Sequence, residues 1–240
     1  MSKLDQPREI IDRRSVAAAL AEATVNVTGQ AEVRKTVLDH LKTALDAGES
    51  VIQARFETRE DWGLNTVAER SYLMDQILRI LFDFGVEQVF KGATQTDAEP
   101  VSLVAMGGYG REELSPESDI DLLFLMPYKL PPSTEQLVEF MLYTLWDLNL
   151  KVGHATRSLD DNIRQAQADM VIRTAMLDAR WIWGDQDLFQ SFWHRFQNEV
   201  IKDSAVSFVE AKLAERDARH ARTGDSRYVL EPNIKEDKGG

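Results

Sequence analysis

The sequence contains no cysteine and no long hydrophobic run, and each absence excludes a class of protein or site. Without cysteine there are no disulfide bonds, thiolate nucleophiles or cysteine-bound zinc, which fits a reducing compartment. The longest strongly apolar run, Leu122 to Met126, is far shorter than the roughly 20 residues that a membrane span requires. The first twenty residues scatter seven charges and have no apolar core of signal-peptide length. We therefore expect a cytoplasmic protein with no membrane partner.

Positive charge is also scarce, because 28 Lys and Arg residues stand against 40 Asp and Glu residues, for a net charge of −12. Affinity for a phosphate backbone comes mainly from basic side chains, so we expect no general nucleic-acid partner. Any polyanionic substrate would need a bound cation or a local basic pocket. Hydrophobic residues make up 43% of the 240 residues, which is enough to bury a core in one large domain or two small ones.

The first 92 residues have the apolar spacing of helices. In the stretch from Gln30 to Thr58, and again around Val67 to Leu81, apolar residues recur at steps of three, four and seven. We predict long helices here, forming a helical region over residues 1–92 that packs on a catalytic core. The polar segment from Lys91 to Pro100 is predicted to be a loop and a domain boundary.

The middle of the chain has the short apolar runs that are typical of buried strands. We predict three strands, over Val101–Met106, Asp119–Met126 and Leu150–Leu159, with a helix over Ser133–Leu148. From Leu159 to about Arg222 helical spacing returns, broken near Gly184-Asp185, and Tyr228 to Gly240 is predicted to be irregular. The pattern indicates an α+β fold with a small sheet embedded in helices. We expect a core over residues 93–160 and a helical segment over 161–240 that ends in the start of a linker.

Two carboxylates in the second strand have the spacing of a metal site. Side chains alternate along a strand, so Asp119 and Asp121 are expected on the same face, with Cα atoms about 6.6 Å apart. Carboxylates at this spacing can share divalent cations, which hold the attacking and leaving oxygens of a phosphoryl displacement. Mg²⁺ prefers oxygen ligands of this kind and usually keeps contact with substrate phosphates.

A glycine cluster precedes the carboxylates. Gly107, Gly108 and Gly110 have no side chains, so backbone N–H groups can approach a triphosphate closely, and Arg111 adds a cation. Between Val101 and Met126 one Arg stands against five acidic residues, so a nucleotide bound here requires a metal. Taken separately, an Asp-X-Asp strand is often a solvated sheet face and a glycine cluster is usually a turn. Their combination in strand, glycine loop, strand order favours catalysis.

The run GGYGREELSPESDIDLLFL, from Gly107 to Leu125, resembles the nucleotidyltransferase superfamily typified by DNA polymerase β. More narrowly, it resembles the N-terminal nucleotidyltransferase domain of bacterial protein-PII uridylyltransferases. Later segments are similar to landmarks of that family: Leu145-Trp146-Asp147, Val152-Gly153-His154 and Glu231 to Lys235. The resemblance implies a small mixed sheet of the polymerase β type, surrounded by helices.

The resemblance also implies roles for individual residues. Asp119 and Asp121 would be catalytic and bind Mg²⁺ or Mn²⁺, and Gly107 and Gly108 would lie against the triphosphate. The other residues expected to bind nucleotide are Gly110, Arg111, Ser118, Lys151 and Arg157. The implied reaction transfers UMP from UTP to a tyrosine of the PII signalling protein and releases pyrophosphate.

Many relatives in the superfamily use a third carboxylate on the next strand, and here that strand has none. Asp147, Asp178 or Glu231 remain candidates for the third metal ligand. In the third strand, Lys151, His154 and Arg157 are instead candidates to face the phosphates, although a lone His is more often a structural residue.

The resembled enzymes continue with a His-Asp metal domain and ACT domains. None of the four histidines here is followed by Asp, so we expect a truncated chain without uridylyl-removing activity or a glutamine sensor. Two alternatives remain open. One is a related transferase with another nucleotide donor or acceptor, and the other is a nucleotide-sensing module without catalysis.

Overall fold

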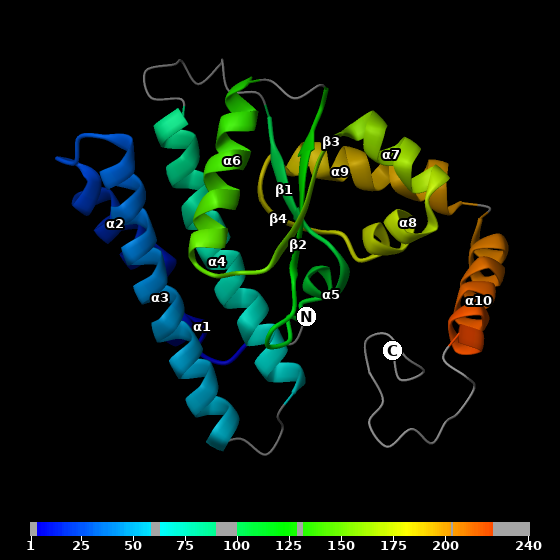
Figure 1. The fold of residues 1–240 in the computed structure, drawn as a ribbon, viewed down its shortest axis with the longest axis horizontal. Helices are drawn as coiled ribbons and strands as arrows, with labels where there is room; N and C mark the ends of the chain where they lie inside the picture. Colours follow the sequence, from blue (N-terminus) through cyan, green and yellow to red (C-terminus); the bar gives the residue numbers. More distant parts are fainter. Residues whose placement is uncertain (1–3, 59–62, 90–99, 129–131, 203, 223–240) are drawn as a thin grey trace. The chain divides into compact units, whose positions relative to one another are not determined.

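The computed structural model describes residues 4–58, 63–89, 100–128, 132–202 and 204–222 (Figure 1). The chain divides into two compact units, residues 1–193 and 194–240, and each is described by itself. The sequence predictions for Lys91 to Glu99 and for Tyr228 to Gly240, including the landmark from Glu231 to Lys235, fall outside the described residues.

Helices make up the N-terminal part of the first unit, as the apolar spacing predicts. They are α1 (Pro7–Ile10), α2 (Arg13–Thr24), α3 (Gln30–Thr58) and α4 (Leu64–Val89). The Asp12 carboxylate caps α2 by accepting hydrogen bonds from the N–H groups of Arg14 and Ser15. Residues Val37, Leu41 and Leu45 form the buried stripe of α3, which confirms that helix from Gln30 to Thr58.

A mixed four-stranded sheet lies beside these helices. Its strands are β1 (Ser102–Ala105), β2 (Ile120–Met126), β3 (Val152–Ser158) and β4 (Arg180–Gly184), in the order β3-β2-β1-β4. Strand β1 is antiparallel to both β2 and β4, and β2 is parallel to β3. Helix α6 (Pro132–Asp147) joins β2 to β3, because parallel neighbours need a crossover connection. The three predicted strands and the helix between them are confirmed.

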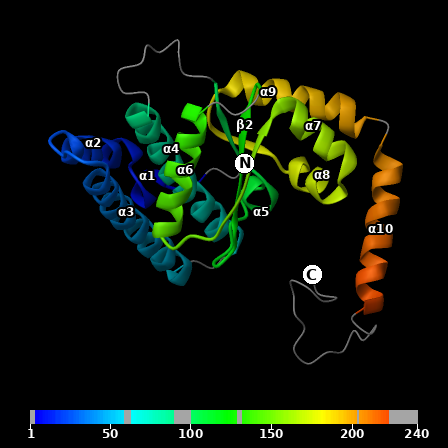
Figure 2. The same cartoon turned by 45° about the horizontal axis from the view of Figure 1, so that its top comes forward.

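The two faces of the sheet are covered by different helices. Figures 1 and 2 show α4 and α6 on one side, and α5 (Gly107–Gly110), α7 (Leu159–Ala168) and α8 (Met170–Leu177) on the other. In β2 the fully buried Ile120, Leu122 and Phe124 belong to the main hydrophobic core with α4 and α6. Because side chains alternate along a strand, Asp121 faces the opposite side.

Strand β4 corrects the prediction of helical structure from Leu159 up to the break near Gly184-Asp185. It pairs with β1 and forms one edge of the sheet, so the sheet includes residues well beyond the third predicted strand. The segment Arg180–Gly184 has only five residues, and so short an apolar run does not distinguish a strand from part of a helix. Its β-forming residues Trp181, Ile182 and Trp183, followed by Gly184 at φ 78°, are the signal that the helical reading overlooked. The predicted domain limits at residues 92 and 160 stay a prediction.

Helical structure resumes after β4. Helix α9 (Gln186–Arg195) follows, and the second unit contains a π-helical turn, η2 (Phe196–Ile201), and helix α10 (Ala205–Arg222). Phe196 and Val200 are buried, whereas Val206, Val209 and Leu213 of α10 are exposed.

Candidate functional site

The carboxylate of Asp121 lies between two glycines from different elements. Asp121 is the second residue of β2, and its partner in the parallel strand β3 is Gly153. A Cβ atom on Gly153 would lie 2.4 Å from Asp121 Oδ1, and one on Gly107 would lie 3.2 Å from Oδ2. A side chain at Gly153 would therefore displace this carboxylate. The Met106 N–H donates to the Asp121 carbonyl at 3.0 Å, which fixes the turn against the strand.

The second predicted carboxylate, Asp119, is exposed and directly precedes β2. The adjoining Ile120 N–H donates to the Lys151 carbonyl at 2.8 Å, so the entry to β2 is tied to the entry to β3. Ser118 is exposed in the turn before Asp119, where its N–H donates to the Ser115 carbonyl at 3.2 Å. The joint metal-binding role of Asp119 and Asp121 stays a prediction.

The predicted glycine loop is a one-turn helix, α5. The N–H groups of residues 110 to 113 donate to carbonyls of residues 106 to 109, so Gly107 and Gly108 are not the donors of these turn hydrogen bonds. Gly107 has φ 58°, and a Cβ on Gly110 would lie 1.9 Å from the Asp178 carbonyl oxygen. A Cβ on Gly108 would meet nothing closer than 3.6 Å. The fold thus requires glycine at positions 107 and 110 and leaves space at Gly108.

Arg111 lies beside this turn and is ion-paired with two carboxylates. Its Nε is 2.9 Å from Glu113 Oε2, and its Nη1 is 2.6 Å from Asp178 Oδ2. The hydrogen bonds to Glu113 and then to Asp178 raise the pKa of Arg111. A Cβ on Gly108 would lie 3.7 Å from Arg111 Nη2, so this guanidinium lies next to the glycine, and its role in nucleotide binding stays a prediction.

The cationic residues of the third strand divide between its faces. Arg157 pairs with Leu125 and lies on the same face as Asp121, and its Nη1 is 3.5 Å from Asn162 Oδ1 of α7. Lys151 directly precedes β3, with its Nζ 3.4 Å from Glu117 Oε2. His154 lies on the other face, with its ring centroid 6.1 Å from that of Trp146. His154 therefore does not share the face of Asp121.

A third metal-binding carboxylate is not evident in the part of the chain that the structure describes. No group of three His, Asp or Glu residues is placed there to hold a metal ion. Asp147 accepts from Arg34 Nη2 of α3 at 2.6 Å, Asp178 accepts from Arg111, and Glu231 is outside the described residues. The carboxylates of Asp119 and Asp121 still suit Mg²⁺, because this ion is usually bound by one or two carboxylates together with substrate phosphates.

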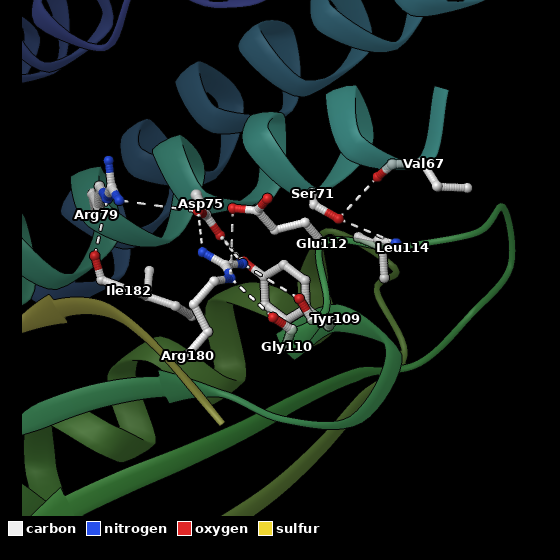
Figure 3. A network of polar contacts seen from close by, with 10 residues as sticks. All are labelled: Val67, Ser71, Asp75, Arg79, Tyr109, Gly110, Glu112, Leu114, Arg180 and Ile182. Carbon is white, nitrogen blue, oxygen red and sulfur yellow. Dashed lines mark hydrogen bonds and ion pairs between the residues drawn. The ribbon is translucent and has the colours of Figure 1, made fainter. Parts of the chain in front are cut away.

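Three residues that hold the glycine turn were missed in the sequence. The buried Tyr109 hydroxyl donates to Asp75 Oδ1 of α4 at 2.7 Å, and Arg180 of β4 donates to the same carboxylate (Figure 3). Burial, followed by the charge of Asp75, raises the pKa of Tyr109 well above its ordinary value. A signal was available for Asp75, because Asp75 and Gln76 interrupt an otherwise apolar run from Tyr72 to Leu78.

Comparisons with known proteins bear on the fold and the family of the chain. Residues 86–182 match the nucleotidyltransferase domain family, and residues 207–240 match the family described as GlnD PII-uridylyltransferase. The first match includes the glycine turn, Asp119, Asp121, strands β1 to β3 and the first three residues of β4, and the mixed α+β structure confirms the predicted fold class.

Curated proteins named bifunctional uridylyltransferase/uridylyl-removing enzyme match along the whole chain. The protein from Rhodospirillum rubrum is 52% identical over 238 residues, 99% of this chain and 25% of that protein. The one from Azospirillum brasilense is 48% identical over 239 residues, 100% of this chain and 26% of that protein. The chain thus spans about a quarter of the length of these relatives.

Among solved structures, one match is a chain from the structure titled "Crystal structure of the toxin-antitoxin with AMP-PNP". The alignment covers 60% of this chain and 96% of the matched chain. The identity is 16% and the TM-score 0.27, which is too low to support an inference. Among the described residues, no helix is both long and apolar enough to cross a membrane.

Proposed function

Since the chain carries a nucleotidyltransferase domain and is a relative of the bifunctional uridylyltransferase/uridylyl-removing enzymes, we propose that it transfers UMP from UTP to a tyrosine of the PII protein. The observation that carries this proposal is the placement of the Asp121 carboxylate between Gly107 and Gly153, beside the glycine turn. This placement puts the Asp121 carboxylate, which can bind a metal, next to a segment where a triphosphate can approach the backbone.

The residues present fit a divalent metal, on which nucleotidyltransferase domains generally depend. We infer that Asp119 and Asp121 hold Mg²⁺ or Mn²⁺, because both offer the hard oxygen ligands that these ions prefer. When bound, the metal neutralises phosphate charge and aligns the attacking and leaving oxygens. The glycines on either side of Asp121, Gly107 and Gly153, give its carboxylate room.

The other residues of the proposed site position the triphosphate. Gly108 gives a phosphate close access to the backbone, and Arg111 stands next to it as a fixed cation. Lys151 and Arg157 supply further positive charge from the β3 side. In the reaction the tyrosine oxygen loses its proton and bonds to the α-phosphorus, and the bond from that phosphorus to the bridging oxygen breaks to release pyrophosphate. Catalysis then rests on positioning and charge neutralisation.

The test is transfer of labelled UMP from UTP to PII protein in the presence of Mg²⁺. We expect Asp119→Asn and Asp121→Asn each to reduce the rate at least about 100-fold, since each removes a charge that acts on the reacting phosphates. Glu139→Gln is the matched control, because Glu139 is an exposed acid on α6, away from the glycine turn. Transfer that survives the double Asp119→Asn, Asp121→Asn variant would contradict the proposal.

The choice of nucleotide and acceptor is tested separately. Binding of UTP, ATP, CTP and GTP is compared in the presence of Mg²⁺, and a clear preference for ATP would favour a transferase with another donor. The described part of the chain shows no third carboxylate near the pair, which favours a second candidate, a nucleotide-sensing module. That candidate predicts nucleotide binding without pyrophosphate release.

A further inference from the structure

A stripe of polar side chains on α4 faces the segment that follows β1 and, at one end, strand β4. Ser71, Asp75 and Arg79 recur at four-residue spacing, so they lie on one side of the helix. Ser71 and Asp75 are buried, with only 1% and 6% of their surface exposed. Buried polar groups are costly unless they are hydrogen-bonded, so their partners indicate what the stripe does.

Those partners belong to the glycine turn and its continuation (Figure 3). The Leu114 N–H donates to Ser71 Oγ at 3.1 Å, and the Tyr109 hydroxyl donates to Asp75 Oδ1 at 2.7 Å. Helix α4 therefore holds the chain at two points, five residues apart, directly after the glycines that we propose approach the nucleotide.

Arg180 completes the connection from the neighbouring strand β4. Its Nη1 and Nη2 donate to the two carboxylate oxygens of Asp75, at 2.6 and 3.0 Å. Its Nε donates to the Gly110 carbonyl at 3.2 Å, and its Nη2 also donates to the Tyr109 carbonyl at 3.3 Å. One guanidinium thus joins α4 and β4 to two consecutive carbonyls of the turn.

The contacts of Arg180 also affect its protonation. Burial is the largest influence and lowers the pKa of Arg180, but the hydrogen bonds to Asp75 and the charges of Asp75, Tyr109 and Glu112 together raise this pKa overall. A buried ion pair is weak support for stability, because desolvation opposes the Coulomb attraction. The pair of Arg180 and Asp75 has a more specific effect on geometry, because it holds the glycine turn in one conformation. A turn with three glycines loses much conformational entropy when it is fixed in this way.

We propose that Arg180, oriented by Asp75, is a positioning residue for nucleotide binding, because it fixes the carbonyls of Tyr109 and Gly110 and thereby the glycine turn. This inference rests on the proposed function. Arg180 acts through the turn, because its hydrogen bonds go to Asp75 and to the carbonyls of Tyr109 and Gly110.

The test compares Arg180→Lys with Arg79→Lys in the whole chain. Lysine keeps the charge but cannot bond Asp75 and two carbonyls together. Arg79 is the matched control, because it lies 4.0 Å from Asp75 and bonds the Ile182 carbonyl of β4 at 3.1 Å, with no hydrogen bond to the turn. Amide hydrogen exchange of residues 107 to 111, urea denaturation, and KM and kcat with UTP and Mg²⁺ are measured for both variants.

We expect Arg180→Lys to accelerate exchange in the turn and to raise KM for UTP about tenfold, with kcat changed less than about twofold. Arg79→Lys should leave KM and turn exchange unchanged, even where the two variants lose similar stability. Unchanged exchange and KM in Arg180→Lys would overturn the inference, as would equal effects in Arg79→Lys. If the wild-type chain binds no UTP, the proposed function is overturned. In that case amide hydrogen exchange in the two variants alone decides whether Arg180 holds the turn.

Discussion

At the scale of single residues, the three glycines after β1 serve different needs. Gly110 is required by packing, since a Cβ would lie 1.9 Å from the Asp178 carbonyl oxygen, and Gly107 is required by its φ of 58°. Gly108 has neither constraint, and it lies in the helical turn α5. Nothing in the fold explains glycine at this position, whereas close approach of a phosphate would explain it.

The substitution Gly108→Ala should therefore weaken UTP binding without destabilising the fold. The new Cβ would be 3.6 Å from the Glu113 carbonyl oxygen, an ordinary contact, so stability should be unchanged or increase by about 0.5 kcal/mol. UTP affinity should fall about tenfold or more if the triphosphate lies against this backbone. Urea denaturation and UTP titration with Mg²⁺ measure the two effects. Undiminished UTP affinity would remove Gly108 from the proposed site.

The element scale shows what the sequence could and could not predict. Helices α3 and α4 and strands β1 to β3 were predictable because apolar spacing and turn residues are local signals. Strand β4 has a weaker local signal, because its run of five residues is too short to distinguish a strand from part of a helix, and only its pairing with the distant β1 establishes it. The pair Asp119 and Asp121 was identifiable from spacing, but Asp75 and Arg180 meet only through the fold, 105 residues apart.

The role of Gly153 also depends on strand register, since β3 must pair in parallel with β2 for this glycine to lie beside Asp121. Gly153→Ala should displace the Asp121 carboxylate, reduce UMP transfer at least about 100-fold and cost about 1–3 kcal/mol of stability through overpacking. His154→Ala is the neighbouring control, because His154 is exposed on the opposite face and should leave transfer unchanged. Equal transfer rates in both variants and the wild type would show that Asp121 does not need this space. Initial rates and urea denaturation measure both quantities.

At the scale of the whole molecule, the buried Tyr109 links the stability of the fold to alkaline pH. Burial and then the Asp75 charge raise its pKa above the ordinary value of about 10, so the folded state retains a proton that the unfolded state loses. The free energy of unfolding contributed by this group is therefore fully present below pH 10 and falls as pH rises above it.

Tyr109→Phe should thus lower stability at pH 8 by about 1 kcal/mol, through loss of the hydrogen bond to Asp75, and make the decline above pH 10 shallower. Tyr128→Phe is the control, since Tyr128 is 75% exposed, and it should keep the wild-type decline. Tyr72, whose pKa is also raised by burial, should account for part of the slope that remains. Urea denaturation from pH 8 to pH 11 provides the measurement, and an unchanged slope in Tyr109→Phe would contradict this account.

The position of β4 in the chain also has a consequence for synthesis on the ribosome. Strand β1 ends at Ala105, but the strand that covers its outer edge ends at Gly184. At roughly 5–20 residues per second, translation leaves that edge without its partner for about 4 to 16 s. An uncovered strand edge is a template for pairing with other chains. The nascent protein therefore passes through an interval in which this edge of β1 is open to pairing with other chains, and slow translation of residues 106–184 would lengthen that interval.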